Sequence, residues 1–329
     1  MIGLLPRVLL AVVAALIAVD TVWLLAVHIP VDWPAYIKLG GVSAAFVLGG
    51  MFYAYIRKDE RLTAMLFGAA FLTAFSNAAS VLNYLLLTVA GKRIDGTLAQ
   101  IDRMIGVDWP AMIAWAGDHR AINMVLFTVY ACVLPEVALL LPLLGWRSST
   151  EKIYSFCFAI VLATVVTMGF WTFFPSFGAM VVYDLPHALL AHTPLQLDKN
   201  YANDLLRLLA NGPGFITPKD LKGLIGFPSF HAVLALLVTW YARDLKYVRW
   251  PIIALNSLVL IATPFQGGHH VIDVVAGFAV AALAIIAADK FAAFAALAGT
   301  RNRSRRIAAA ATLHASLRLL EPQSRHGRI

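Results

Sequence analysis

Two short polar clusters interrupt the apolar second half of the chain and hold the residues best suited to chemistry. The first, residues 226–232, reads GFPSFHA, and the second, residues 267–274, reads GGHHVIDV. Each directly precedes an apolar stretch that we expect to be a membrane helix. The free N–H groups and partial positive charge of a helix N-terminus suit an anion such as phosphate. Ser229 would add a hydroxyl donor, and Gly268 would let the backbone approach a bound group.

Three titratable side chains in these clusters form a catalytic pattern. His269 and Asp273 are four residues apart, so on a helix they share one face. The carboxylate can accept the hydrogen on Nδ1 of the imidazole and leave Nε2 free as a nucleophile. An acidic side chain at a membrane boundary is usually explained by a partner, which His269 provides. His231, from the neighbouring helix, is placed to protonate a leaving oxygen and later to activate an incoming hydroxyl.

The two clusters resemble the second and third motifs of the type-2 phosphatidic acid phosphatase superfamily, roughly PSGH and SRxxxxxHxxxD. The forms FPSFHA and GGHHVIDVVAG are more similar to the branch that contains fungal inositol phosphorylceramide synthase and the sphingomyelin synthases. The resemblance covers about residues 150–290. It implies that His269 attacks phosphorus to form a phosphohistidine, that Asp273 orients His269, and that His231 is the general acid and base. It also implies that Ser229 contacts phosphate oxygens and that no metal or other cofactor is needed.

The chain departs from the superfamily pattern at its phosphate-binding cations. The first motif, KxxxxxxRP, is absent, and Ala262 and Thr263 stand where the third motif has Ser-Arg. A site with fewer cations suits a phosphodiester, with one negative charge, better than a monoester, with nearly two. We therefore favour headgroup transfer between lipids over simple phosphatase action. Three basic residues of the loop before the first cluster could replace the lost charge: Arg207, which we prefer, Lys219 and Lys222.

Other interpretations of the same residues stay open. A lipid phosphatase acting on phosphatidic acid-like or prenyl phosphate monoesters would use the same groups with water as acceptor. A lipid transporter or scramblase would use the charged groups only to bind headgroups, and an inactive relative would serve as a scaffold. His, His and Asp also suit zinc, although the resemblance favours phosphohistidine chemistry. We expect His270, where the family pattern often has Tyr, to lie behind the reacting groups.

The composition of the whole chain indicates a membrane protein. Hydrophobic residues make up 60% of the 329 residues and charged residues 13%, against about 45–50% and about 25% in soluble domains. Disordered proteins, disulfide scaffolds and ordinary cytosolic enzymes are thereby excluded. We predict an all-α polytopic membrane protein with a six-helix catalytic core. Its eight expected spans, each near the 20 residues that a bilayer requires, are 8–28, 37–56, 62–89, 121–145, 153–173, 229–243, 250–265 and 270–290.

Three regions and one orientation follow from the order of spans and charges. We expect N-terminal transmembrane helices and an outer interfacial loop over 1–120, the catalytic bundle over 121–292, and a basic cytoplasmic tail over 293–329. With the N-terminus inside, 17 of the 26 lysines and arginines fall on the inner segments, as the positive-inside rule requires. Both termini are then cytoplasmic and the site faces the periplasm or a lumen. The alanine-rich composition favours a bacterial inner membrane.

The net charge of +8 is therefore a topology signal, and nucleic acid is not an expected partner. The partners are membrane lipids, and the oligomeric state is left open. Two copies of the sequence VDWPA, at 31–35 and 107–111, predict helix starts at the outer surface. Residues 174–178, FPSFG, are interpreted as the exit from the fifth span. Residues 307–320 predict a short amphipathic helix on an anionic leaflet.

Overall fold

The structure is a computed structural model that describes residues 3–147, 149–197 and 200–320, with only the backbone described from 299 onward. Among these residues the regular secondary structure is helical, and the two residues that pair as in a strand, Val31 and Ile216, form an isolated bridge and no sheet. The predicted fold class, an all-α polytopic membrane protein, is confirmed.

Each of the eight expected spans is helical. In the described chain, five segments are long and apolar enough to cross a bilayer: α1 (Leu4–Val27), α2 (Trp33–Phe52) with its extension to Arg57, α3 (Glu60–Leu85) with its extension to Thr88, α8 (Thr150–Phe173) and the first part of α13 (Val271–Leu320). Two helices are shorter or have more polar ends: α11 (Phe230–Ala242) and α12 (Arg249–Gln266).

The remaining span is a bent pair. Helices α6 (Arg120–Ala131) and α7 (Val133–Arg147) meet at an angle of 48°. Taken together they are long and apolar enough to cross a bilayer. Pro135 has no N–H to donate to the carbonyl of Ala131, four residues earlier, so the helix breaks there.

The VDWPA repeats begin helices, as their sequence predicts. Asp32 is the N-cap of α2 and accepts a hydrogen bond from the Ala35 N–H at 3.1 Å. Asp108 caps α5 (Trp109–Asp118) in the same way, with the Ala111 N–H at 3.1 Å. In each copy the proline falls in the first helical turn, where its missing N–H has no partner to lose.

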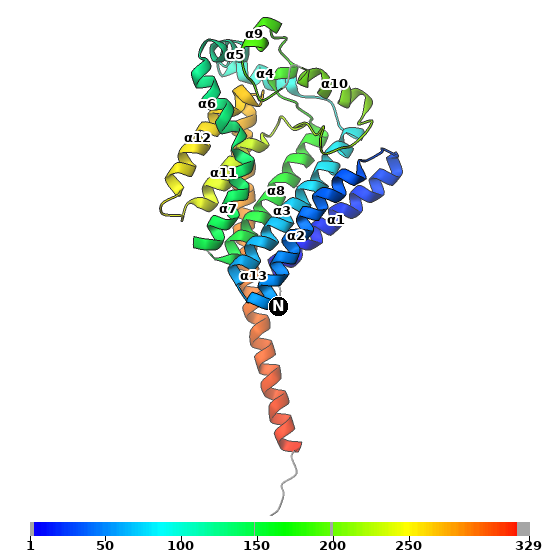
Figure 1. Cartoon of the computed structure of the whole chain (residues 1–329), viewed down its shortest axis with the longest axis vertical. Coiled ribbons are helices and arrows are strands. Elements are labelled where there is room, and N and C mark those ends of the chain that lie inside the picture. The colour runs from blue at the N-terminus through cyan, green and yellow to red at the C-terminus, as the bar shows by residue number, and fades with distance from the viewer. Residues whose placement is uncertain (1–2, 148, 198–199, 321–329) are drawn as a thin grey trace, which may run out of the picture.

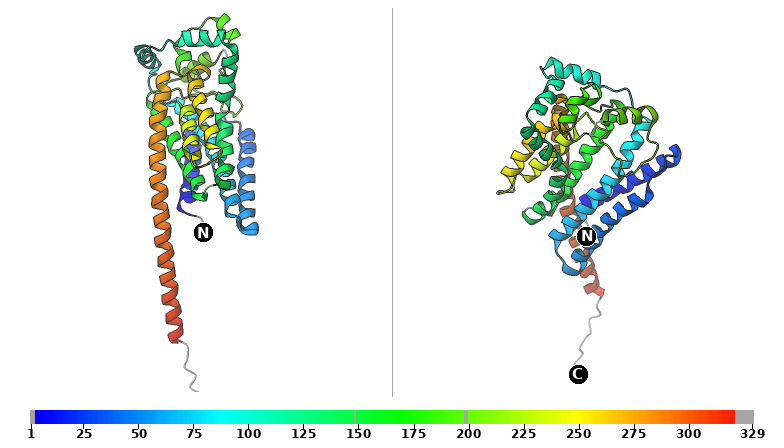
Figure 2. Two further views of the ribbon diagram at one scale, coloured as in Figure 1. Left: turned by 90° about the vertical axis from the view of Figure 1, so that its left-hand side faces the viewer. Right: turned by 45° about the horizontal axis from the view of Figure 1, so that its top comes forward.

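The helices form an elongated bundle whose two ends differ (Figures 1 and 2). One end carries the short helices α4 (Asp95–Met104), α5, α9 (His187–His192) and α10 (Tyr201–Asn211). The N-terminus lies toward the other end, where α13 continues past the bundle to Leu320. Residues 307–320 are thus helical, but as an extension of the last span and not as a separate surface helix.

Helix α8 lies at the centre of the bundle and packs against α3, α11 and α13. Its buried residues include Phe156, Ala159 and Ala163, all with no exposed surface. Helices α11 and α13 therefore share a rigid central partner. Both begin near the end that carries the short helices (Figure 1), which brings the two polar clusters to one place.

Candidate active site

The two polar clusters meet because the starts of α11 and α13 are tied together. Ser229 is the N-cap of α11, with its Oγ 3.5 Å from the Ala232 N–H. Its own N–H donates to the Asp273 carbonyl, in the first turn of α13, at 3.0 Å. A Cβ at Gly277 would lie 2.9 Å from both the Ser229 carbonyl oxygen and the Ala232 Cβ. Glycine at this position lets the two helices pack closely.

His269 is held by two hydrogen-bond acceptors. Its Nδ1 lies 2.9 Å from the Gly226 carbonyl oxygen and 3.3 Å from Oδ2 of Asp273. Because neither a carbonyl nor a carboxylate oxygen can donate, Nδ1 carries the hydrogen and Nε2 keeps a lone pair. Nε2 lies 3.5 Å from Oγ of Ser229. The His269–Asp273 pairing expected from the i, i+4 spacing is present.

Asp273 is itself fixed in place. Its side chain has no exposed surface, and Oδ2 accepts the backbone N–H of His270 at 2.8 Å as well as facing His269. A buried carboxylate needs such donors. The aspartate therefore has one defined orientation relative to the His269 ring.

His231, in the first turn of α11, faces His269 with ring centroids 6.5 Å apart and planes inclined by 64°. Its Nδ1 lies 3.1 Å from the hydroxyl of Tyr130, a residue of α6. Neither cluster contains this tyrosine, and no motif in the sequence marks it as part of the site. The structure thus brings together all three predicted catalytic side chains, and adds a fourth polar group beside them.

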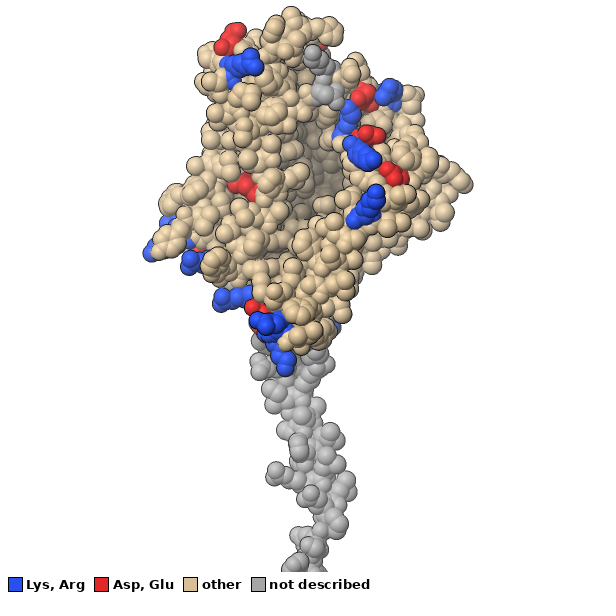
Figure 3. Space-filling view, viewed as in Figure 1, with Lys and Arg blue, Asp and Glu red and all other residues tan. Residues whose placement is uncertain are grey.

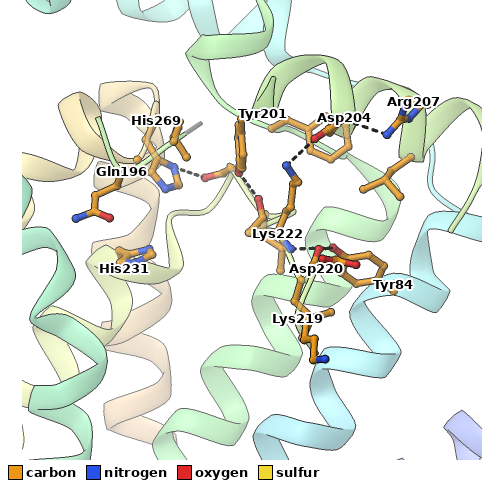
Figure 4. Close-up of a pocket in the computed structure, with 18 of the residues that line it drawn as sticks. Tyr84, Gln196, Tyr201, Asp204, Arg207, Lys219, Asp220, Lys222, His231 and His269 are labelled. Atoms are coloured by element: carbon orange, nitrogen blue, oxygen red, sulfur yellow. Dashed lines mark hydrogen bonds and ion pairs between the residues drawn. The ribbon is translucent and has the colours of Figure 1, made fainter. Parts of the chain in front are cut away.

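A cavity of about 800 Å³ opens in front of the two histidines. Figure 3 shows a hollow in this face of the bundle, with charged side chains along one rim. His231, His269 and Gly267 line one wall. The charged residues that line the cavity come from α10 and the loop after it: Asp204, Arg207, Lys219, Asp220 and Lys222 (Figure 4).

Arg207 and Lys222 meet at one carboxylate. Nζ of Lys222 lies 2.6 Å from Oδ2 of Asp204, and Nη2 of Arg207 lies 3.1 Å from Oδ1. The Arg207 side chain is 72% exposed, against 23% for Lys222. Both predicted phosphate-binding cations are therefore part of the cavity lining, with Lys222 the more enclosed of the two.

Gly268, which we expected at the phosphate site, does not line the cavity. It has φ +61°, and a Cβ there would lie 2.6 Å from Leu197 and 3.2 Å from Met180. Its neighbour Gly267 lines the cavity. The glycine pair thus allows a left-handed turn at 268 and an open cavity wall at 267.

Residues 174–178 do more than end α8. The Ser176 carbonyl accepts the Gly226 N–H at 2.6 Å, and the Ala179 N–H donates to the Gly268 carbonyl at 2.6 Å. One short segment therefore braces both polar clusters. Residues 174–178 therefore end the span, as expected, and also support the two clusters, which we did not expect.

The buried carboxylate of Asp95 holds that segment in shape. Its Oδ1 accepts the Ser176 hydroxyl and the Phe177 N–H, both at 2.8 Å, and the Gly178 N–H at 3.0 Å. Burial raises the pKa of Asp95, against the opposing effect of these three donors. Nothing in the local sequence marks this residue, because its partners lie more than 80 positions away.

His270 lies behind the reacting residues, as expected. It has no exposed surface, and its Nδ1 lies 3.6 Å from Oδ2 of Asp102. Asp102, from α4, also accepts the N–H groups of Val271 at 2.8 Å and Ile272 at 3.0 Å. It thus caps α13 from a distant part of the chain. Burial lowers the pKa of His270 to about 4.

The acidic residue Glu136 lies apart from the cavity. Its Oε1 is 3.5 Å from Nδ2 of Asn256, which links α7 to α12. This contact fits the interhelical role that polar side chains take within a bilayer.

The described chain is thus a helical bundle with membrane-spanning segments that carries a histidine–aspartate pair and a second histidine at one end. The model of the PAP2 superfamily matches residues 96–287, more than half of the chain, and the chain belongs to that superfamily. No curated protein and no solved structure is significantly similar to the chain. Membership supports a lipid phosphatase or phosphotransferase type of function in an integral membrane protein.

Proposed function

We propose that the protein is a lipid phosphotransferase that moves a phosphate-containing headgroup from one lipid to another through a phosphohistidine. The observation that supports it most is the arrangement of His269 and His231. Both line one cavity of about 800 Å³, and Nδ1 of His269 faces two acceptors, so Nε2 keeps its lone pair. A nucleophile and a proton donor are the two groups that displacement at phosphorus requires.

The reaction proceeds by two displacements. In the first, Nε2 of His269 forms a bond to phosphorus, the bond from phosphorus to the lipid oxygen breaks, and His231 gives that oxygen a proton. In the second, the acceptor hydroxyl attacks phosphorus, returns a proton to His231 and releases His269. Asp273 stabilises the positive charge that develops on His269. Ser229 is buried and outside the cavity lining, so its Oγ, 3.5 Å from Nε2 of His269, acts beside the nucleophile and not on the cavity wall.

Charge in the cavity favours a phosphodiester donor. Three cations and two carboxylates line it, which leaves one net positive charge. A phosphodiester carries one negative charge and a monoester nearly two. This balance fits a glycerophospholipid donor and a lipid hydroxyl acceptor, the chemistry of the inositol phosphorylceramide and sphingomyelin synthase branch that the motifs resemble.

A second candidate function is a lipid phosphate phosphatase with water as the acceptor. The observation in its favour is that Arg207, Lys219 and Lys222 all line the cavity. These residues could supply the positive charge that the chain lacks at the motif positions. Substrate in this case would be a monoester of the phosphatidic acid or prenyl phosphate type. The same two histidines would act, and only the second displacement would differ.

We also propose that the site faces the periplasm or lumen and both termini face the cytoplasm. Three arginine–tryptophan pairs with guanidinium-to-ring distances of 3.9–5.8 Å lie on segments that this orientation places inside: Arg147 with Trp146, Arg243 with Trp240, and Arg249 with Trp250. Tryptophan prefers the membrane interface and arginine the cytoplasmic side. The alanine-rich composition favours a bacterial inner membrane.

Product analysis tests the proposed function. Purified protein is incubated with phosphodiester lipids or lipid phosphate monoesters, with and without ceramide or diacylglycerol, and the lipids are identified by mass spectrometry. A new phosphorylated lipid that requires the acceptor is expected. Free phosphate from monoesters alone would assign the phosphatase function instead.

Two variants control this experiment. His269→Ala is expected to abolish the product, whereas His187→Ala, which removes an exposed histidine of α9, is expected to leave it unchanged. Absence of any product from the unsubstituted protein, together with lipid movement between leaflets, would replace the enzyme by a scramblase.

A further inference from the structure

We propose that Tyr130 is a positioning residue that engages Nδ1 of His231, so that Nε2 is the nitrogen that exchanges a proton with the leaving oxygen. This inference rests on the proposed function and adds a residue to it. Tyr130 lies on α6, about 100 positions before His231 and outside both polar clusters.

Two contacts join the residues. The Tyr130 hydroxyl lies 3.1 Å from Nδ1 of His231, and the rings stack with centroids 4.2 Å apart and planes inclined by 19°. Tyr130 is 9% exposed. The ring contact fixes the plane of the imidazole, and the hydroxyl fixes how the ring is turned within that plane. His231 therefore presents one defined edge to the cavity.

The hydrogen bond determines which nitrogen of His231 exchanges a proton. A neutral imidazole that lost its N–H would become an imidazolate, so the general acid is the imidazolium, with hydrogen on both nitrogens. Among the described residues, Nδ1 of His231 is the hydroxyl's hydrogen-bond partner. The Nδ1–H of the imidazolium therefore donates to the phenol oxygen, and Nε2–H is left to face the leaving oxygen.

The backbone leaves room for this contact. A Cβ at Gly267 would lie 2.4 Å from the Tyr130 hydroxyl oxygen and 2.7 Å from Cδ2 of His269. Glycine at 267 therefore lets the phenol and both histidines occupy one wall of the cavity. Tyr130 and Gly267 both belong to the cavity lining.

In the first displacement the proton on Nε2 of the His231 imidazolium passes to the oxygen that leaves phosphorus, and the ring is left neutral with its hydrogen on Nδ1. Nδ1 stays hydrogen-bonded to the phenol throughout. Loss of the hydroxyl would let the ring rotate. In the first displacement the effect should appear only when the leaving oxygen needs a proton.

Dependence on the leaving group tests this role. Tyr130→Phe keeps the ring stack and removes the hydroxyl. With an alkyl ester, whose alkoxide leaves poorly, we expect the rate of the first displacement, measured as release of the alcohol in a single turnover, to fall about 3- to 10-fold, as for the loss of one hydrogen bond. With the p-nitrophenyl ester of the same phosphoryl group, which leaves without a proton, this rate should change less than twofold. Equal losses on both esters would overturn the proposal.

Tyr241→Phe is the matched control. It removes a buried tyrosine hydroxyl from the same helix as His231, one that bonds to Oγ of Ser155 at 2.9 Å, outside the cavity lining. We expect a lower Tm and the same ratio of rates on the two esters. A changed ratio in this variant would show that helix destabilisation alone produces the effect.

A double mutant distinguishes the role of Tyr130 from the proposed enzymatic function. If Tyr130 acts through His231, Tyr130→Phe should have no further effect in the His231→Ala background. Additive losses would contradict the proposal while leaving the enzyme intact. Inactivity of the unsubstituted protein on both esters would overturn the proposed function itself, and the ¹⁵N signals of His231 would then test its hydrogen bond to Tyr130 separately.

Discussion

His231 and His269 face each other across the start of two adjacent helices, with ring centroids 6.5 Å apart. Each is held through Nδ1, but by partners of different kinds. His269 faces the Gly226 carbonyl and the Asp273 carboxylate, whereas His231 faces a phenol. In His269 the acceptors hold the hydrogen on Nδ1 and Nε2 keeps a lone pair, whereas in His231 the phenol engages Nδ1 and leaves Nε2 to exchange a proton. Two identical side chains thereby take different roles.

Replacing Asp273 by asparagine should reduce kcat strongly. The amide can still accept the His270 N–H, but it no longer compensates the positive charge that develops on His269. By analogy with other histidine–carboxylate pairs we expect a loss between about 10² and 10⁴. The Gly226 carbonyl, 2.9 Å from Nδ1, should keep the loss toward the lower figure. Steady-state kinetics measure it, and a variant as active as the parent would contradict the assigned role.

Removing the distant cap of α13 should weaken both stability and catalysis. Asp102→Ala leaves the Val271 and Ile272 N–H groups without their acceptor, and loss of an N-cap costs about 0.5–2 kcal/mol. Because His269 directly precedes this helix, kcat should fall together with Tm. Asp108→Ala, which uncaps α5, should lower Tm and spare kcat. Equal kcat losses in both variants would show a general loss of fold.

Acid should destabilise the fold through His270. Burial lowers its pKa to about 4, below the value near 6.5 of an unfolded histidine. The unfolded chain therefore binds more protons between these values. His270 contributes its stability fully above pH 6.5 and loses it as the pH falls toward 4. Asp102, His269 and Arg103 are the charged or titratable groups that face it.

His270→Gln is the variant that isolates this effect. The fall of Tm between pH 6.5 and 4, measured in detergent, should be less steep in the variant than in the parent. Identical slopes would mean that other groups cause the acid sensitivity.

Cysteine accessibility tests the orientation. Met104→Cys introduces a thiol at an 85% exposed position of α4, and Tyr247→Cys introduces one at a 74% exposed position between α11 and α12. In intact cells a membrane-impermeant maleimide should label the first and not the second. The unsubstituted protein, with Cys157 buried in α8 and Cys132 half-buried at the break between α6 and α7, gives the background. The reverse pattern would invert the proposed topology.

Features encoded locally in the sequence were predictable, and long-range ones were not. The helix starts at Asp32 and Asp108 and the pairing of His269 with Asp273 depend on residues three or four positions apart. The contacts of Asp95, Asp102 and Tyr130 join positions more than 80 residues apart. No periodicity or turn signal carries such information. These contacts arise only when α4 and α6 lie beside the starts of α11 and α13 and the segment that follows α8.

The resemblance to family motifs also had a limit. It indicated that two cations were missing, but it could not show which residues replace them. The structure places Arg207, Lys219 and Lys222 along the cavity because α10 and its following loop fold over it. Gly268 illustrates the opposite case, since its position next to His269 did not place it in the cavity.

Trapping the covalent intermediate tests the central claim most directly. Protein is incubated with a donor labelled with ³²P in its phosphoryl group, without acceptor, and quenched in alkali, where a phosphohistidine survives. We expect one labelled peptide that contains His269, loss of the label in His269→Ala, and its release when a lipid hydroxyl is added. Turnover without label on the protein, or label that persists in His269→Ala, would contradict the account.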